Sequence, residues 1–321
     1  MKDFTSFGGI NHKRERLYIH WDITTLCSYD CEYCYAKYQY TLENAWQKEA
    51  QEKTIKAVLN SIKLSTLPVF FGLLGGEPTS SRYFNLIVEN IPSILKRHSD
   101  NRVYITSNLY RSKEWLKQNI VEAIPEEYHN KVKILASFHP EYIKDKKTFD
   151  EFTEKLLLLN EYFQVKINIM LVENNELGYN LWMKWLQQDE IKNRNFIIHP
   201  HLIYPDGSPF RDINEIYKGL DQFKDLYKYS KKEYIDSNNK EYNDYEVFIK
   251  DIHHFKGWTC YQNNYEISFN GTVNQLCGNN KIVSLEKHPL YFNKIKKIKG
   301  IKCPMDNCSC DGLLKCEREK L

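Results

Sequence analysis

The sequence lacks several features that would place it in broad classes of protein. No apolar run among its 321 residues approaches the roughly 20 residues that a membrane-spanning helix needs. Residues 1–9 have no apolar stretch of the kind found in a secretory signal peptide. The net charge of +3 is too small to require nucleic acid or another polyanion as a partner. We therefore expect a cytoplasmic protein that binds neither membrane nor nucleic acid.

Cysteine, in contrast, is abundant. The chain holds nine cysteines, and an odd number cannot form a fully paired set of disulfides. In a reducing cytoplasm metal binding is the more common fate of such residues. Hydrophobic residues make up 42% of the chain, which at this length supports one barrel-sized domain with an appendage.

Three of the cysteines stand close together near the N-terminus. Cys27, Cys31 and Cys34 form the pattern C-x-x-x-C-x-x-C, with the aromatic Tyr33 directly before the third. Three thiolates cannot complete the four ligands of a tetrahedral zinc ion or a four-iron cluster. On a cluster the open iron can hold a non-protein ligand, which is what a catalyst requires. The alternative is a structural zinc knuckle whose fourth ligand lies elsewhere.

Two predicted strands flank this pattern. Residues 17–24 are rich in aromatic and β-branched side chains and predict a strand, and residues 42–63 predict an amphipathic helix. The cysteines thus lie on a loop at the carboxyl end of the first strand. The second strand, at 68–74, ends in Gly75-Gly76-Glu77-Pro78. Two glycines let the backbone approach a ligand closely, and a proline stiffens the following turn.

The cysteine pattern followed by Gly-Gly-Glu-Pro on the second strand resembles the signature of the radical S-adenosylmethionine (radical SAM) enzymes. The resemblance implies that Cys27, Cys31 and Cys34 hold a [4Fe–4S] cluster whose fourth iron is chelated by S-adenosylmethionine (SAM). It also implies an electron donor such as a flavodoxin or ferredoxin. The residues that it would place against SAM are Tyr33, Gly75, Gly76, Glu77, Pro78, Ser107, Asn108 and Ser137.

Strand and helix signals continue to alternate along the chain. The further predicted strands are 102–108, 131–138, 164–172 and 195–204, and the helices between them are 81–97, 112–123, 149–162 and 177–189. Six such units predict an α/β fold, a partial (β/α)6 barrel that is part of a TIM barrel. We place this radical SAM core at 1–208, a helical linker at 209–256 and a small Cys-rich α+β domain at 257–321.

The other six cysteines lie in the last of these domains: Cys260, Cys277, Cys303, Cys308, Cys310 and Cys316. Asn270-Gly271, between the first two, predicts a two-residue hairpin that brings Cys260 and Cys277 together. The arrangement resembles the auxiliary-cluster modules of radical SAM enzymes called SPASM and twitch, although the late spacing C-x4-C-x-C-x5-C differs from SPASM.

Six thiolates cannot fully ligate two four-iron clusters. We expect one auxiliary [4Fe–4S] cluster, held by Cys260, Cys277 and two of the late four cysteines, with Cys308 and Cys310 preferred. A structural zinc site is the alternative.

Four residues are candidates for contact with the substrate. His139 and Glu141 follow the fourth strand, where the sequence departs from the Ser-x-Asp of many relatives. His199 and His201 stand two apart on the sixth strand and so share a face. The alternatives are that His139 and Glu141 only cap the strand, and that His199 and His201 form hydrogen bonds with neighbouring polar groups.

The resemblance implies reductive cleavage of SAM to a 5′-deoxyadenosyl radical that removes a hydrogen atom from the substrate. An auxiliary cluster could accept the remaining electron, bind the substrate or relay electrons. Only 26 residues precede Cys27, too few for the leader-binding domain of many peptide-modifying relatives. We therefore expect oxidation or rearrangement of a small molecule such as a sugar or a nucleotide-linked compound. The alternatives are a cross-link, thioether or epimerisation in a ribosomal peptide, and a metal-binding regulator without catalysis.

Overall fold

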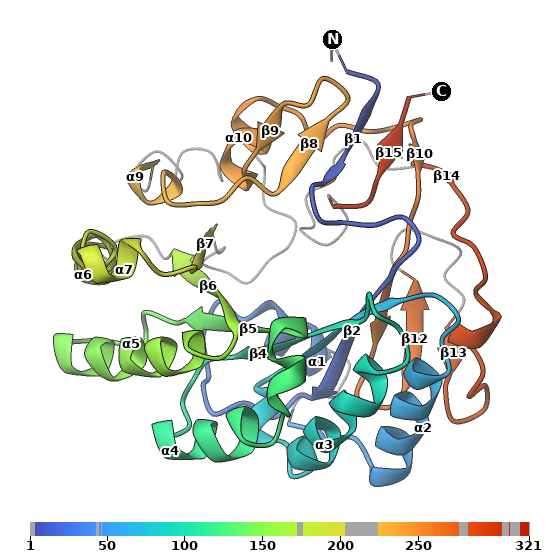
Figure 1. Ribbon diagram of the computed structural model, residues 1–321, viewed down its shortest axis with the longest axis horizontal. Helices are drawn as coiled ribbons and strands as arrows, with labels where there is room; N and C mark the ends of the chain where they lie inside the picture. Colours follow the sequence, from blue (N-terminus) through green and yellow to red (C-terminus); the bar gives the residue numbers. More distant parts are fainter. Residues whose placement is uncertain are drawn as a thin grey trace.

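The computed structural model describes residues 4–42, 45, 47–171, 176–202, 224–275, 282–303, 308 and 315–320. Within these ranges the strands form two sheets, each with its own hydrophobic core. The larger sheet has nine strands in the order β13-β12-β11-β2-β3-β4-β5-β6-β7. Helices cover one face of this sheet, and the smaller sheet stands over the other (Figure 1).

Six strands of the larger sheet form the partial barrel. They are β2 (Leu17–Thr24), β3 (Val69–Gly75), β4 (Arg102–Ser107), β5 (Val132–Phe138), β6 (Gln164–Leu171) and β7 (Ile197–Leu202). Each pairs in parallel with the next along the chain, as crossover helices between strands require. The predicted α/β partial barrel is confirmed.

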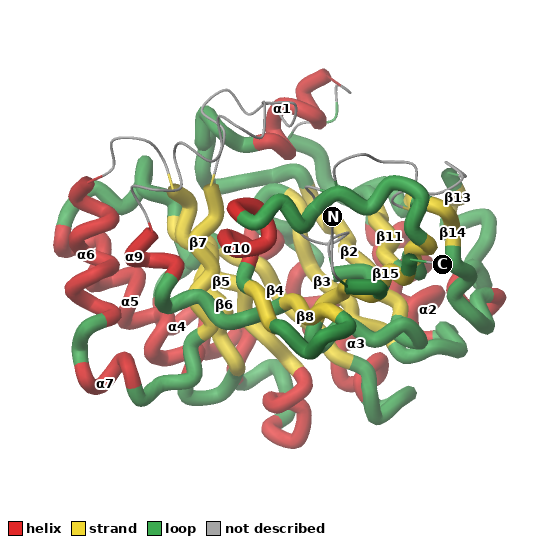
Figure 2. The backbone as a smooth tube through the Cα atoms, turned by 90° about the horizontal axis from the view of Figure 1, so that it is seen from above, coloured by secondary structure: helices red, strands yellow, loops and turns green. Residues whose placement is uncertain are grey.

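Helices connect these strands, most of them along the outer side of the sheet, while α1 lies apart from the others at the top of the view (Figure 2). They are α1 (Tyr35–Leu42), α2 (Glu52–Lys63), α3 (Phe84–Leu95), α4 (Lys113–Leu116), α5 (Lys146–Asn160), α6 (Glu176–Leu186) and α7 (Asp189–Lys192). Three short turns add to them: the 3-10 turns η1 (Pro78–Ser80) and η3 (Glu126–Lys131), and the π-helical turn η2 (Lys117–Val121). None of the described helices is long and apolar enough to cross a membrane.

The prediction of a single helix over 42–63 is wrong: α2 begins only at Glu52, because the chain before it pairs with the end of β2. Thr25 donates its backbone N–H to Lys48 O (2.8 Å) and its hydroxyl to Ala45 O (2.7 Å). Glu49 forms an antiparallel bridge with Thr24. A backbone that bonds to a strand end cannot also continue a helical hydrogen-bond ladder.

The barrel strands present different chemistry on their two faces. Along β2, Leu17, Ile19, Trp21 and Ile23 are fully buried on the helix side, whereas His20 and Asp22 alternate with them and are only partly buried. The register places His20 beside Gly72 of β3, and Gly72 beside Tyr104 of β4. The inner face of the barrel is therefore polar.

A C-terminal hairpin extends this sheet. Strand β11 (Asn264–Ile267) pairs in parallel with β2, and β12 (Thr272–Gln275) and β13 (Val283–Ser284) follow in antiparallel fashion. The predicted hairpin is confirmed, but its turn is longer than two residues. Ser268 donates to Thr272 O (2.9 Å), so three residues lie between them, ending in Gly271 at φ +76°. A glycine with positive φ at this position is typical of three-residue hairpin loops.

The smaller sheet is antiparallel and combines segments from both ends of the chain. Its strands, in spatial order, are β14 (Ile301–Lys302), β10 (Thr259–Cys260), β15 (Arg318–Glu319), β1 (Ser6–Gly9), β8 (Tyr234–Asp236) and β9 (Glu241–Tyr242). Figure 1 shows β1 beside β15, near the two chain ends. The helices here are α9 (Lys224–Tyr227) and α10 (Asp244–Ile249), with the 3-10 turn η5 (Phe292–Lys294) nearer the hairpin.

The two sheets cross the boundaries expected from the sequence. The smaller sheet takes β1 from the first predicted domain and β8 and β9 from the segment predicted as a helical linker, which holds strands as well as helices. The larger sheet takes β11 from the last domain. Because strand pairing joins the three segments, the division of the chain at 208 and 256 stays a prediction.

Candidate active site and cysteine sites

The three N-terminal cysteines lie on the loop between β2 and α1. Cys31 is buried, and Cys27 and Cys34 are partly buried. Cys27 Sγ accepts the N–H of Tyr29, and Cys34 Sγ accepts that of Lys37, both at 3.4 Å. Burial raises the pKa of Cys27 to about 11 and that of Cys31 to about 12. These thiols are therefore protonated at neutral pH until a metal cation binds. Backbone N–H groups already point at the sulfurs of Cys27 and Cys34.

The glycines of Gly-Gly-Glu-Pro pack directly against this loop. Gly75 has a φ of +119°, and a Cβ on it would lie 2.0 Å from Thr24 O. A Cβ on Gly76 would lie 2.2 Å from Leu26 O. The two segments are also hydrogen-bonded, Gly76 N–H to Thr24 O (2.9 Å) and Glu77 N–H to Leu26 O (2.7 Å). The close approach that these glycines allow is thus to the backbone leading into the cysteines.

Glu77 joins the ends of β3 and β4. Its carboxylate is buried and accepts the N–H and hydroxyl of Thr79 (3.1 and 2.6 Å) and the N–H of Asn108 (2.7 Å). Burial raises its pKa, and these hydrogen bonds oppose the rise. Asn108 in turn donates to Ser28 Oγ (3.1 Å) and lies 4.0 Å from Cys27 Sγ. Both oxygens of Glu77 therefore hold protein groups around the cysteine loop.

The other predicted SAM contacts lie on the same edge of the sheet. Pro78 opens η1, directly after Glu77. Ser107 is buried at the end of β4 and accepts the N–H of Leu109 (3.0 Å). Ser137 is buried near the end of β5, beside Asn168 of β6 in the register. The structure thus brings all of these residues to the carboxyl end of the barrel, where parallel strands place ligand sites.

Tyr33, His139 and Glu141 lie against the cysteine loop. The hydroxyl of Tyr33 is 2.9 Å from His139 Nδ1, and Cys31 Sγ is 3.5 Å from the same nitrogen. Burial lowers the pKa of His139 to about 4, so its ring is neutral and can accept the Tyr33 hydrogen at Nδ1. The pKa of Glu141 is raised by burial, while a hydrogen bond with Cys31 opposes the rise. His139 and Glu141, predicted to face the substrate, thus contact the ligand loop.

The two histidines of β7 are described to different extents. His199 is buried, with Nδ1 3.9 Å from Glu233 Oε2. Glu233 also binds Lys166 (3.2 Å) and Lys315 (3.1 Å). Although burial opposes ionisation, these lysines hold the pKa of Glu233 below its usual range. His199 therefore belongs to a charged network inside the barrel, while the side chain of His201 lies outside the described residues.

Two carboxylates on the inner face were not predicted from the sequence. Asp22 accepts a hydrogen bond from Tyr40, and burial raises its pKa to about 6. Glu266 is exposed to solvent and stands beside His20 in the register of β11 and β2. Partial desolvation by the surrounding strands and the charge of Asp22 raise its pKa. The alternation along 17–24 could have identified Asp22, but Glu266 requires the pairing of β11 with β2.

A chain of hydrogen bonds leads from this inner face to the C-terminal cysteines. Tyr104 Oη lies 2.6 Å from His20 Nδ1, and His20 Nε2 lies 3.4 Å from Asn264 Oδ1. Asn264 Nδ2 then donates to Cys316 Sγ at 3.0 Å. Burial lowers the pKa of His20 to about 4, so the ring is neutral and can accept from Tyr104 while donating to Asn264.

Four of the C-terminal cysteines meet in the core of the smaller sheet. Cys260, Cys303, Cys308 and Cys316 are all buried there, and none forms a disulfide. A hydrogen bond with Cys260 lowers the pKa of Cys316. The buried Arg318 donates to Cys308 Sγ at 3.1 Å, and thiolates at the four cysteines would raise the pKa of its guanidinium. Cys277 and Cys310, which the sequence favoured as ligands, lie outside the described residues.

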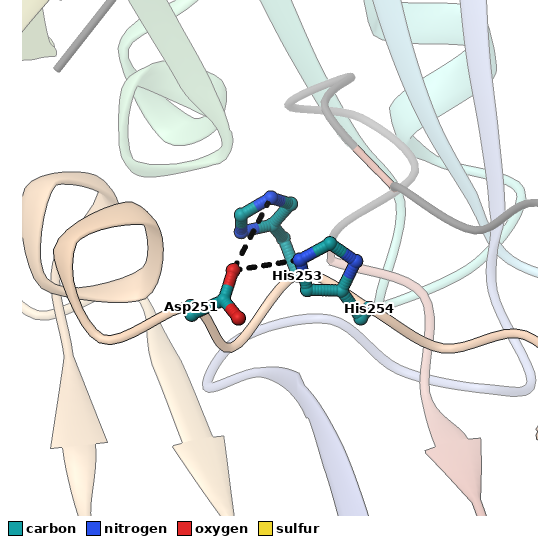
Figure 3. A group of neighbouring side chains, drawn as sticks. All are labelled: Asp251, His253 and His254. Carbon is teal, nitrogen blue, oxygen red and sulfur yellow. Dashed lines mark hydrogen bonds and ion pairs between the residues drawn. The ribbon is translucent and has the colours of Figure 1, made fainter. Parts of the chain in front are cut away.

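Asp251, His253 and His254 form a compact group beside this core (Figure 3). His254 Nε2 is 2.6 Å from Asp251 Oδ1, and His253 Nε2 is 4.0 Å from it. The shorter distance is that of a hydrogen bond, whereas two ligands of one tetrahedral zinc ion would be about 3.4 Å apart. The carbonyl of His253 accepts the N–H of Cys308 (2.9 Å). This turn therefore positions the backbone that carries Cys308.

Residues 21–177 match the family model of the radical SAM superfamily, over the segment that carries Cys27, Cys31, Cys34 and Gly75-Gly76-Glu77-Pro78. The chain contains a radical SAM domain. It is accordingly an enzyme, and its cofactors include a [4Fe–4S] cluster and SAM. No curated protein matches the chain.

Solved structures of radical SAM proteins share the fold of this chain. Native anSMEcpe with bound AdoMet has a TM-score of 0.54 and 16% identity, covering 93% of this chain and 88% of the other. SuiB of Streptococcus suis bound to its precursor peptide SuiA has a TM-score of 0.52 and 13% identity, covering 94% of this chain and 70% of that one. Native anSMEcpe with AdoMet and the Cp18Cys peptide has a TM-score of 0.50 and 15% identity, covering 87% and 81%.

Proposed function

We propose that this radical SAM enzyme carries two [4Fe–4S] clusters, a catalytic one on Cys27, Cys31 and Cys34 and an auxiliary one in the smaller sheet. The catalytic cluster and SAM would supply a 5′-deoxyadenosyl radical that abstracts a hydrogen atom from the substrate. An electron donor such as flavodoxin or ferredoxin would reduce the catalytic cluster in the cytoplasm. The residues named above at the carboxyl end of the barrel would hold SAM beside the cysteine loop.

One observation carries the auxiliary site: Cys260, Cys303, Cys308 and Cys316 meet in one buried core. This proposed set differs from the one expected from the sequence, which was Cys260, Cys277 and two of the late four cysteines, with Cys308 and Cys310 preferred; Cys277 and Cys310 lie outside the described residues. Four thiolates complete the ligands of a four-iron cluster and leave no open iron, which favours a role in electron transfer over substrate binding.

The spacing of the sulfurs favours a cluster over zinc. Zn–S bonds of 2.3 Å place the ligands of a tetrahedral ion about 3.8 Å apart. Among the described residues, only Asp251, His253 and His254 form a group of three or more ligand atoms that all lie within 4.8 Å of one another. No three of these sulfurs are as close together as zinc requires.

The substrate should be polar, because the inner face of the barrel is lined by Asp22, Glu266, Tyr104 and Lys166. A small molecule with several hydrogen-bonding groups, such as a sugar or nucleotide-linked compound, fits these side chains. A ribosomal peptide is the second candidate, since two of the similar structures contain peptides, Cp18Cys and SuiA.

The ligand set can be tested in a Cys27/Cys31/Cys34→Ala background, where only the auxiliary site remains. After anaerobic reconstitution we expect about four irons per chain, lost when Cys260, Cys303, Cys308 or Cys316 is changed to Ser. Cys277→Ser and Cys310→Ser are the matched controls and should retain iron. Zinc in place of iron, or iron loss in both controls, would contradict the proposal. Only the wild type should form 5′-deoxyadenosine.

The substrate class can be tested with the low-molecular-mass fraction of a cell extract. A small-molecule substrate should stimulate formation of 5′-deoxyadenosine equally before and after protease treatment of the fraction. Loss of stimulation after protease would instead support a peptide.

A further inference from the structure

Arg318 is a cation buried at the auxiliary cysteines. It is 1% exposed, and its guanidinium donates to Cys316 O (2.7 Å) and to Cys308 Sγ (3.1 Å). It also stands 4.6 Å from the centre of the Phe255 ring. Burying a guanidinium costs several kcal/mol unless negative charge compensates it. The sulfurs of the auxiliary site are in the position to provide that charge once they are ionised.

Strand β15 separates this cation from a second one. Side chains alternate along a strand, so Cys316 and Arg318 face the buried core while Glu317 and Glu319 face the other side. There Glu317 and Glu319 bind Arg14, whose guanidinium lies 3.5 Å from the centre of the Tyr261 ring. Arg14 is partly exposed and neutralised by carboxylates, whereas Arg318 faces sulfur.

A second N–H donor reaches the same site from the barrel. Asn264 Nδ2 donates to Cys316 Sγ at 3.0 Å, and its Oδ1 lies 3.4 Å from His20 Nε2. His20 holds Asn264 in this orientation from the barrel side. The sulfurs of Cys308 and Cys316 thus each accept a hydrogen bond from a side-chain N–H group. The donor to Cys308 is the positively charged guanidinium of Arg318.

We propose that Arg318, assisted by Asn264, raises the reduction potential of the auxiliary cluster. This inference rests on the proposed function, because it requires a cluster on these cysteines. A four-iron core with four thiolates is negatively charged, and reduction adds one more negative charge. A fixed cation and N–H donors to sulfur stabilise the reduced state more than the oxidised state. Arg318 is a positioning and tuning residue that does not itself touch the substrate.

The test is a redox titration with mediators, followed by the EPR signal of the reduced cluster in full-length protein. In the Cys27/Cys31/Cys34→Ala background the auxiliary cluster is observed alone. Arg318→Gln should shift the midpoint potential to more negative values, and Asn264→Leu should cause a smaller shift in the same direction. Arg318→Lys keeps the charge and should stay closer to the parent. Arg14→Gln, the matched control, should leave the potential unchanged.

The outcomes separate this inference from the proposed function. If the parent holds no iron at these cysteines, the proposed auxiliary cluster is wrong. If iron and sulfide content is intact but Arg318→Gln has the parent's potential, the cluster stands and the role of Arg318 is wrong. If neither Arg318 variant assembles the cluster, Arg318 serves assembly and the tuning role is overturned. If only Arg318→Gln fails to assemble the cluster, Asn264→Leu and Arg318→Lys decide. An unchanged midpoint potential in both variants overturns the tuning role, and graded negative shifts in both uphold it.

Discussion

The ring of Tyr104 occupies the space above Gly72 that a side chain would otherwise fill. A Cβ built on Gly72 would lie 1.9 Å from Tyr104 Cζ and 2.3 Å from its hydroxyl oxygen. Because Gly72 has no side chain, Tyr104 can reach across β3 and hydrogen-bond to His20 on β2 at 2.6 Å. Gly72, which stands between Phe71 and Leu73 in β3, thus begins the chain of contacts that ends at Cys316.

Gly72→Ala should destabilise the protein by about 1–3 kcal/mol, because the new methyl group forces the Tyr104 ring away from His20. The measurement is the thermal unfolding midpoint of reconstituted enzyme. In a Tyr104→Ala background the same substitution should cost clearly less, since the ring is gone. An equal loss of stability in both backgrounds would show that the contact between residue 72 and the Tyr104 ring is not the cause of the effect.

Gly76→Ala should disrupt the catalytic cluster, because its methyl group would lie 2.2 Å from Leu26 O, just before Cys27. We expect the affinity for SAM to fall by about tenfold or more, measured by equilibrium binding to the reconstituted enzyme. Gly257→Ala is the control: Gly257 has a φ of +81° but no atom within 4 Å of the added Cβ. SAM affinity that is intact in Gly76→Ala would exclude this steric account.

His139→Leu should weaken SAM cleavage even without substrate, because it removes the hydrogen bond between the His139 ring and the hydroxyl of Tyr33 beside Cys31. Loss of one such hydrogen bond costs about 1 kcal/mol, or several-fold in rate or affinity. The measurement is the rate of 5′-deoxyadenosine formation under reducing conditions. Tyr33→Phe removes the same hydrogen bond from the other side and should match it. Unchanged cleavage in both variants would show that this hydrogen bond does not support SAM cleavage.

The pH dependence of stability should report on Asp22. Its pKa in the folded protein, about 6, lies above the ordinary value of 3.8, so the folded state binds more protons than the unfolded state between these values. Stability from this group is present at low pH and is lost as pH rises through about 4 to 6. The loss, on the order of 1–3 kcal/mol, should be absent in Asp22→Asn.

Thermal midpoints between pH 4 and pH 8, which span the range in which Asp22 titrates, would measure this difference. Asp100→Asn is a suitable control, because Asp100 is an exposed carboxylate bound to Lys13 whose pKa is shifted downward. The wild type and Asp100→Asn should lose stability in parallel as pH rises, while Asp22→Asn loses less. Parallel curves for all three proteins would contradict the raised pKa of Asp22.

Local sequence determined the order of elements and the ligand loop. Strand and helix periodicity predicted the six barrel strands, since burial on the helix side repeats every second residue along each of them. Cys27, Cys31 and Cys34 lie within eight residues of one another, so short-range geometry alone brings them together. The break between α1 and α2 could not be predicted, because it depends on bonds from residues 45–49 to Thr24 and Thr25.

The sites that join distant segments were decided by tertiary structure. Cys260, Cys303, Cys308 and Cys316 meet through antiparallel pairing of β10 with β14 and β15, which no spacing in the sequence encodes. Glu266 reaches the barrel only because β11 pairs with β2, more than 240 positions away in the chain. The sequence by itself therefore determined which residue types are present and the local motifs that they form. Which of them face one another was decided by long-range strand pairing, because register and burial depend on the whole sheet.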